Sequence, residues 1–403
     1  MSTLVGLRTR DDHSQARSGG ALLRKGFRPF FLLAAVFAAG KVLAWLLVLN
    51  GLLPLGGAAG PYFWHAHEMI FGFATAVVAG FLLTAASNWT KRETAVGRSL
   101  LALVGLWALG RVAMAAAAFL PGALVAAVDL AFLPAVGVAV GVPIVKSGSR
   151  RNYVLLVVLL ALWIGNVSMH AAAAGLVSIP WTTGAYLAVN VLTLLMLLIG
   201  GRVIPMFTRN ATGRDGIRSL PALDRLAGLS MAALTLAEAF RPGSAAVGWL
   251  ALVTASVALA RTARWGTLAA LSNPLLWILH VGHGFIVLGL LLKGLAALFG
   301  SVPPAISLHA LSVGAIGGLT LGMMARVSLG HTGRMIVIDP VTRVAFHAIV
   351  LAAVARVAGP LLWPMQGLIF WVASGLLFSL AFGLYLFVFS PMLLRPRVDA
   401  KEG

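Results

Sequence analysis

Long apolar stretches, separated by short polar or glycine- and proline-containing segments, follow one another along almost the whole chain. A helix needs about 20 apolar residues to cross the hydrocarbon core of a bilayer. Twelve stretches, numbered here as spans one to twelve, reach about that length near residues 30–52, 63–87, 99–120, 123–145, 152–175, 183–207, 222–240, 245–263, 274–299, 305–329, 341–361 and 366–392. The pattern predicts an all-α polytopic membrane protein with about twelve transmembrane helices. A single transmembrane domain at 27–394 is expected between polar tails at 1–26 and 395–403.

The composition agrees with this class. Hydrophobic residues make up 60% of the chain, charged residues 10%, and the mean hydropathy is +0.97. Soluble domains carry about 25% charged residues and cannot hide so much apolar surface in their cores. The lipid bilayer is therefore an expected partner.

The net charge of +19 could indicate binding to nucleic acid, so the distribution of the charge along the chain has to be considered. Most of the 30 Lys and Arg residues fall in the two tails and in the loops after even-numbered spans, whereas the opposite loops hold only Arg241. This is the positive-inside pattern of membrane proteins. It predicts that both termini are cytoplasmic and that no nucleic acid is bound.

Three threonines suggest an internal repeat. Thr90, Thr208 and Thr332 lie near the ends of spans two, six and ten and are 118 and 124 residues apart. Counting 23 residues back from the first and the last reaches His67 and His309, whereas the same step from Thr208 reaches no histidine. The chain is therefore expected to contain three pseudo-repeats of four helices.

Histidine is the main candidate ligand for a transition metal or haem, because the chain has no cysteine. Neutral imidazole binds both iron and copper. A helix rises about 1.5 Å per residue, so each histidine can be given a depth. An outer group consists of His65, His67, His170 and His309. A histidine at a membrane edge also commonly serves as a hydrogen-bonded anchor, so spacing alone leaves both interpretations open.

The phase of span two separates its two histidines. His65 and His67 are two residues apart and point to roughly opposite sides of a helix, whereas Glu68 shares a face with His65. One histidine can therefore bind a metal while the other has a different role. Glu68 is expected to orient His65 as a hydrogen-bonded carboxylate.

The inner half of the bundle holds a second set of candidates. His280 and His283 share one helical face and, with His347, suggest a three-imidazole copper site. Arg202 and Arg326 lie at the cytoplasmic ends of spans six and ten. Capping a helix end is the favoured role for these arginines, and holding a haem propionate is the alternative.

The remaining intramembrane charges are expected to pair or to reach the interface. Arg111 and Asp129 lie at similar depth on neighbouring antiparallel spans, so an ion pair is predicted. Lys41 is expected to meet Glu68. Lys293 is expected to extend its ammonium outward.

These residues also carry a resemblance to a known family. Four segments in one order are similar to the NnrS family: Gly26-Phe27-Arg28-Pro29-Phe30-Phe31, Trp64-His65-Ala66-His67-Glu68-Met69-Ile70-Phe71-Gly72-Phe73, Gly201-Arg202-Val203-Ile204-Pro205-Met206-Phe207-Thr208-Arg209-Asn210, and Leu308-His309-Ala310 through Gly330-His331-Thr332-Gly333-Arg334. The likeness extends over nearly the whole chain. It implies a bacterial inner-membrane protein that contains haem and copper and is linked to denitrification and to protection against nitric oxide, with no defined reaction.

The resemblance also selects among the candidates. Positions typical of the family fall on His65, His67, Glu68, His170, Arg202, His280, His309 and His331. His283 and His347 lie outside the family pattern, which weakens the three-imidazole site.

The resulting hypothesis is a haem ligated by His67 and His309 across spans two and ten. His65 and His170 are the candidates for copper or a second haem ligand. Nitric oxide is the expected ligand, with quinol or another compound as a possible electron donor. A twelve-span secondary transporter and a quinol-linked oxidoreductase of the haem–copper type remain alternatives.

Overall fold

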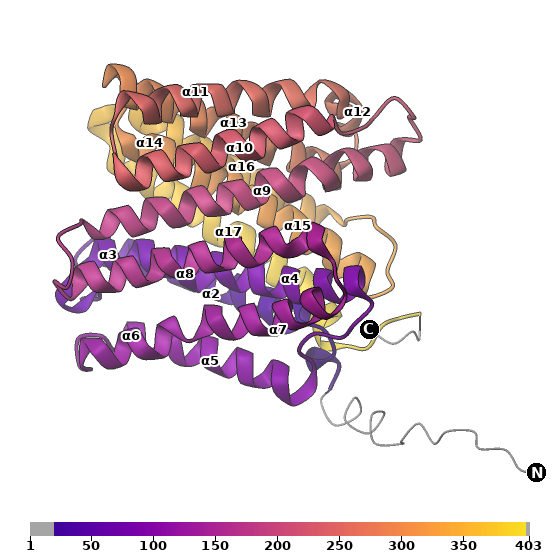
Figure 1. Ribbon diagram of the computed structural model, residues 1–403, viewed down its shortest axis with the longest axis horizontal. Coiled ribbons are helices and arrows are strands. Elements are labelled where there is room, and N and C mark those ends of the chain that lie inside the picture. Colours follow the sequence, from indigo (N-terminus) through magenta and orange to yellow (C-terminus); the bar gives the residue numbers. More distant parts are fainter. Residues whose placement is uncertain (1–19, 400–403) are drawn as a thin grey trace, which may run out of the picture.

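The computed structural model describes residues 20–399, and within them the chain forms helices and no strands (Figure 1). Most helices run roughly side by side along one axis (Figure 1). This architecture confirms the predicted all-α polytopic class. The predicted tails at 1–26 and 395–403 fall partly outside the described residues, which exclude 1–19 and 400–403.

The first third of the bundle contains spans one to four. They are α2 (Phe27–Leu49), a second span made of α3 (Pro61–His67), η3 (Glu68–Ala74) and α4 (Thr75–Thr90), then α5 (Gly97–Ala115), and a fourth span made of α6 (Gly122–Leu130) and α7 (Phe132–Lys146). Spans five to eight are α8 (Tyr153–Ala173), α9 (Trp181–Thr212), α10 (Pro221–Phe240) and α11 (Ala245–Ala260).

Spans nine to twelve complete the bundle. They are α13 (Pro274–Phe299), a tenth span made of α14 (Pro304–His309), η6 (Ala310–Gly317) and α15 (Gly318–His331), then α16 (Pro340–Leu362) and α17 (Gly367–Leu394). A short helical turn, η1 (Ala21–Leu23), precedes the first span, and others connect the spans: η2 (Gly57–Ala59), η4 (Arg150–Asn152), η5 (Arg261–Arg264), α12 (Thr267–Ala270) and η7 (Pro364–Gln366).

Among the described residues, eleven helical segments are long and apolar enough to cross a membrane. The seventh predicted span, α10, is the exception because Asp224, Arg225 and Glu238 interrupt its 20 residues. Two of these charges are paired with neighbouring helices. Asp224 lies 2.6 Å from Arg261, and Glu238 forms an ion pair with Lys293. The seventh segment is thus helical, as predicted, but more polar than the others.

Spans two and ten lie at the centre of the bundle. Of their most apolar 18-residue windows, 89% and 72% are buried, against 33% for α2. Helix α17 packs along α2, and Arg28 donates hydrogen bonds to the carbonyls of Leu393 and Arg395. The first and last spans therefore lie next to each other. We call the end where α2 begins and α17 ends the basic end, and the opposite end the far end.

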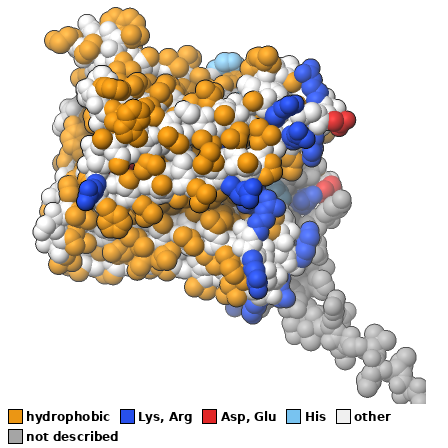
Figure 2. All heavy atoms as spheres, turned by 45° about the horizontal axis from the view of Figure 1, so that its top comes forward, with side chains coloured by type: hydrophobic (Ala, Val, Ile, Leu, Met, Phe, Trp, Pro, Cys, Tyr) orange, Lys and Arg blue, Asp and Glu red, His pale blue; other side chains and the backbone are white. Residues whose placement is uncertain are grey.

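Lys and Arg side chains gather at the basic end on the face shown in Figure 2, while hydrophobic side chains cover the middle of the bundle. This is the asymmetry that the positions of Lys and Arg in the sequence predict. An apolar belt with charge concentrated at one end is typical of a protein that spans a bilayer.

Both central spans contain a π-helical segment at the same place. η3 begins directly after His67 and η6 directly after His309. π-Helical turns are rare and are often found at functional sites. Thr90, Thr208 and Thr332 also share one structure, since each hydroxyl donates to the carbonyl four residues earlier, at 2.7, 2.9 and 2.7 Å. The π-helical segments relate spans two and ten, whereas α9 is described as one continuous α-helix, so the threefold repeat stays a prediction.

Candidate functional site

The two histidines of span two have different surroundings. The His65 ring stacks on Trp45, with the ring centroids 4.2 Å apart, and borders a cavity. His67 is fully buried among polar side chains on the other side of the helix. The helical phase predicted this separation.

A cluster of polar side chains, here called the polar cluster, surrounds His67 near the far end. Its members come from four helical spans: His67 and Glu68 from span two, Arg111 from α5, Asp129 from α6, and Asn166 and His170 from α8. All of these side chains are at least nine-tenths buried. The close approach of Gly184 on α9 to Gly165 on α8 allows tight packing beside Asn166.

Arg111 connects the two carboxylates of the polar cluster. It donates one hydrogen bond to Glu68 and another to Asp129, which confirms the predicted Arg111–Asp129 ion pair. The predicted Lys41–Glu68 pair is not formed. The ammonium of Lys41 lies over the ring of Trp64 and has no hydrogen-bond partner in the part of the chain that the structure describes. Glu68 turns to the guanidinium, which offers it a directed donor.

His67 has oxygen atoms at both ring nitrogens. Nδ1 lies 3.1 Å from Glu68 Oε1, and Nε2 lies 3.1 Å from Asp129 Oδ2 and 2.9 Å from Asn166 Oδ1. The Asn166 amide donates to the same Asp129 oxygen at 2.7 Å. If both carboxyl groups are ionised, both ring nitrogens carry protons and His67 is an imidazolium. The positive charges of His67 and Arg111 then balance the two carboxylates.

Glu68 was expected to orient His65, but it contacts His67 instead. The physical reason is the position of the donors, because the Arg111 guanidinium and the His67 ring both lie beside the Glu68 carboxylate. Arg111 reinforces this orientation through its hydrogen bond to Glu68.

The polar cluster contains a group of possible metal ligands. One ligand atom each from His67, Asp129 and His170 lie within 4.8 Å of one another. His170 Nε2 is 3.1 Å from Asp129 Oδ2, the oxygen that also contacts His67. Two imidazole nitrogens and one carboxylate oxygen form a donor set that zinc, copper and iron accept. A metal at this place would replace the proton on His67 Nε2.

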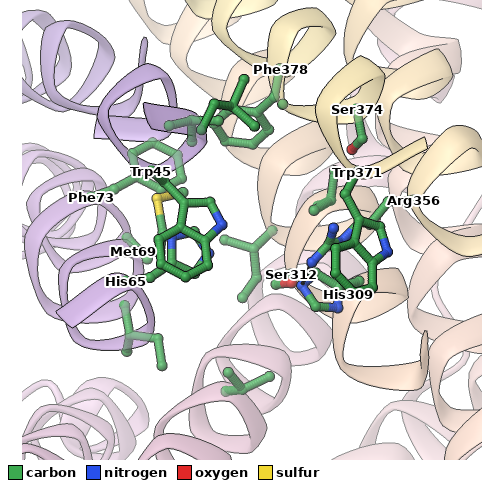
Figure 3. Close-up of a pocket in the computed structure, with 18 of the residues that line it drawn as sticks. Trp45, His65, Met69, Phe73, His309, Ser312, Arg356, Trp371, Ser374 and Phe378 are labelled. Carbon is green, nitrogen blue, oxygen red and sulfur yellow. Dashed lines mark hydrogen bonds between the residues drawn. The ribbon is translucent and has the colours of Figure 1, made fainter. Parts of the chain in front are cut away.

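The cavity beside His65 is the second candidate site, and we call it the histidine cavity. It lies between α2, span two, α9, span ten, α16 and α17 and is partly open to the surroundings. Figure 3 shows Trp45, His65 and Met69 on one wall and His309, Arg356 and Trp371 on the opposite wall. Aromatic and aliphatic side chains make up most of the lining.

The hydrogen bonds of His309 define its tautomer. Nδ1–H donates to the carbonyl of Ala305 at 2.6 Å, which leaves the lone pair on Nε2. Nε2 accepts a hydrogen bond from Arg356 Nη2 at 2.9 Å. Across the cavity, His65 Nδ1 is buried without a hydrogen-bond partner among the described residues. One imidazole of the cavity thus has an unpaired nitrogen, whereas the lone pair of the other accepts from the Arg356 guanidinium.

The structure does not bring His67 and His309 together as the sequence-based hypothesis expects. His65 shares the cavity with His309, and His67 shares the polar cluster with His170. His65 and His170, the candidates for copper or a second haem ligand, therefore lie at different sites. His65 and not His67 shares a cavity with His309, because the neighbouring carboxylates hold His67 in the polar cluster.

The inner-half histidines do not form a three-imidazole site. His280 contacts the hydroxyls of Thr208 and Thr267 at 3.0 and 3.1 Å. His283 donates to a backbone carbonyl of α11 at 2.9 Å, and the exposed His347 donates within its own helix. Each of these histidines faces different neighbours, so their interactions are those of structural residues.

The other sequence candidates also lie away from the histidine cavity. The guanidinium of Arg326 lies 3.8 Å from the centre of the Phe207 ring, and Arg202 is half-buried on α9. Neither arginine lines the cavity. His331 packs against Phe27 with ring centroids 5.6 Å apart.

Sequence reasoning missed Arg356 and Asn166, although both are polar residues inside apolar spans. A polar residue inside an apolar span is a visible signal, but the sequence does not show which side chain either residue contacts. Lys293 was expected to reach outward, yet it donates to Glu238 and to Asn190 within the bundle. The buried carboxylate offers a closer partner than the interface does.

The fold and these sites define a polytopic all-α membrane protein with two histidine-containing sites in one half of its bundle. A family model described as NnrS protein matches residues 21–397. The chain therefore belongs to the NnrS protein family, as its motifs predict. A search of the curated proteins finds no match.

Proposed function

We propose that this chain is a haem- and copper-binding protein of the bacterial inner membrane, and that it binds nitric oxide and protects denitrifying cells against nitrosative stress. Membership of the NnrS family supports the class of function. The concentration of Lys and Arg at the basic end supports cytoplasmic termini, with the two histidine sites toward the periplasmic face. The proposal covers binding and protection and assigns no reaction.

The histidine cavity is the proposed haem site, and the hydrogen bonding of His309 is the observation that carries this assignment. A histidine that ligates a metal commonly donates its other N–H to a backbone carbonyl, as His309 does to Ala305. His65 replaces His67 as the second proposed ligand because it faces the same cavity.

The other cavity residues also fit a haem. The indole rings of Trp45 and Trp371 provide aromatic walls, and Arg356 provides a guanidinium that suits a propionate carboxylate. A bound haem would supply an iron centre that takes a diatomic ligand in place of one of the two imidazoles. Arg356 would then exchange its contact with His309 Nε2 for one with the carboxylate.

The polar cluster is the proposed copper site, with His67, Asp129 and His170 as ligands. Charge balance favours this assignment. A cuprous ion in place of the His67 proton adds one positive charge and removes one, so Arg111 and the metal still balance the two carboxylates. Glu68 would hold the His67 ring through Nδ1, as a carboxylate behind a metal-bound histidine does.

The test is to purify the protein, quantify iron and copper, and record absorption spectra for single alanine variants. We expect His65→Ala and His309→Ala to lose the bis-imidazole haem spectrum and to keep copper. His67→Ala and His170→Ala should lose copper and keep the haem spectrum. The matched control is His347→Ala, because His347 is exposed and remote from both sites.

Each alternative outcome has a defined meaning. Loss of the haem spectrum in His67→Ala but not in His65→Ala would restore the original pairing of His67 with His309. A wild-type protein that binds neither metal would contradict the proposal and favour a transporter, which substrate flux in proteoliposomes would test. Reduction of the haem by an added quinol would identify quinol as an electron donor and favour an oxidoreductase.

A further inference from the structure

A second cavity lies next to the histidine cavity, and we call it the apolar cavity. It lies between α2, α4, α9, α13 and α15 and is partly open to its surroundings. Four of its lining side chains are Phe31, Val77, Leu195 and Met323. None of its lining residues is charged.

The apolar cavity offers almost nothing to a polar ligand. Thr320 is its one lining residue with a hydroxyl, and that hydroxyl is bonded to carbonyls of its own span, with Ile316 O at 2.6 Å. Water needs two to four polar partners to remain in a cavity, whereas apolar cavities stay dry and take up apolar molecules such as xenon. Ions, polar metabolites and haem ligation are therefore excluded as uses of this space.

The two cavities follow each other along span two, α9 and span ten. On each span the histidine cavity ends three residues before the apolar cavity begins, at the pairs Ala74 and Val77, Leu192 and Leu195, and Ile316 and Leu319. Three residues correspond to a rise of about 4.5 Å along a helix. The apolar cavity thus adjoins the histidine cavity on the side toward the basic end.

We propose that the apolar cavity is a holding site for an uncharged diatomic gas, from which the gas moves into the histidine cavity. The identity of the gas as nitric oxide rests on the proposed function, whereas the capacity to hold an apolar gas does not. An apolar lining and a position less than one helical turn from a ligand-binding cavity both suit such an occupant. The central position of spans two and ten favours a gas over a lipid chain from the surrounding bilayer.

Gly200 provides a way to fill the apolar cavity. It lines the cavity from α9, and a Cβ added there would meet only Ile204 Cδ1, at 3.4 Å, which is an ordinary contact. The variant Gly200→Leu should therefore place its side chain in the cavity without moving the backbone. The matched control is Gly105→Leu on α5, where an added Cβ meets nothing within 4 Å.

The first experiment measures binding of xenon to the full-length protein by ¹²⁹Xe chemical-shift titration in detergent without added haem. Wild type and Gly105→Leu should bind xenon saturably, and Gly200→Leu should bind it at least roughly tenfold more weakly because leucine occupies the space. Absence of saturable binding to wild type, or equal binding to Gly200→Leu, would overturn the proposal. So would a phospholipid that native mass spectrometry finds retained by wild type and lost from Gly200→Leu.

A second experiment tests movement of gas between the cavities. In haem-loaded protein, we expect Gly200→Leu to slow the recombination of carbon monoxide after flash photolysis, while its absorption spectrum stays unchanged. Unchanged recombination despite weakened xenon binding would overturn the transfer of gas. Failure of haem to bind would contradict the proposed function alone, because the xenon titration needs no haem.

Discussion

The histidine cavity and the polar cluster lie on opposite sides of the same helix and differ in the hydrogen bonding of their histidines. In the cavity, His65 and His309 face aromatic and aliphatic walls; His65 Nδ1 has no hydrogen-bond partner among the described residues, and His309 Nε2 accepts only from Arg356. In the polar cluster, both nitrogens of His67 are already bonded to side-chain oxygens. The cavity therefore offers a mostly apolar space to a ligand, whereas in the polar cluster positive and negative side chains neutralise one another.

This difference predicts what holds each region together. An unpaired charge inside a protein is costly, so every member of the polar cluster depends on the others. The cavity residues depend on packing and on single hydrogen bonds, which are worth only about 0.6 kcal/mol on average between membrane helices. Substitutions should thus damage the fold at the cluster and damage ligand binding at the cavity.

The largest expected effect comes from Asp129→Leu. This change leaves the guanidinium of Arg111 and the two histidines without their shared carboxylate. We expect the free energy of unfolding to fall by about 3 kcal/mol or more, the cost of breaking a buried ion pair. Denaturation in detergent, followed by tryptophan fluorescence, measures the change.

The double variant Arg111→Met, Asp129→Leu is the control for this prediction. It removes one positive and one negative charge together, so His67 and Glu68 can still balance each other. Its loss of stability should be smaller than the sum of the two single losses. Strict additivity would mean that charge balance does not hold the cluster together.

The next largest effect separates the two histidines of span two. His67→Gln removes hydrogen bonds to three side chains and leaves the cluster with one excess negative charge, so we expect a loss of about 2 kcal/mol. His65→Gln loses mainly its stacking on Trp45, for about 1 kcal/mol or less. Thermal unfolding of both variants in one detergent makes the comparison. Equal losses of stability would show that the hydrogen bonds and charge of His67 contribute no more to folding than the stacking of His65.

The fold was largely predictable because the length and spacing of apolar runs directly reflect the thickness of a bilayer. The main departure was α10, where Asp224 and Glu238 lower the hydropathy. The sequence could not show that both carboxylates have partners on other helices, namely Arg261 and Lys293.

The sequence predicted the depth of the candidate site residues in the membrane but not which neighbouring helix each side chain faces. A rise of about 1.5 Å per residue placed His67 and His309 at related positions in spans two and ten. Which face of a helix meets which neighbour depends on packing between distant segments, and His67 meets Asp129 and Asn166 from other spans. The π-helical segments after both histidines also change the phase, and no local sequence rule predicts them.

The smallest expected effect comes from Asp339, a carboxylate in the loop before α16 that belongs to neither site. It caps the helix, since Oδ1 accepts from the backbone N–H of Thr342 at 3.0 Å and Oδ2 from its hydroxyl at 2.7 Å. Burial raises the pKa of Asp339, but these hydrogen bonds outweigh burial and keep the pKa below its usual value. The stabilisation is therefore complete above a pH of about 4, the unfolded value, and is lost as the pH falls through the folded pKa.

Asp339→Ala consequently measures the cost of losing a carboxylate that lies outside both regions. At pH 7 it should cost about 1 kcal/mol, as the loss of a helix cap usually does. The difference from wild type should shrink as the pH falls below about 4, because the protonated wild-type carboxyl loses its advantage. Asp339→Asn, which caps without titrating, is the matched control, and thermal unfolding across pH is the measurement. If Asp339→Ala cost as much as Asp129→Leu, loss of any carboxylate would be equally damaging, and burial with a balanced charge would not distinguish the polar cluster.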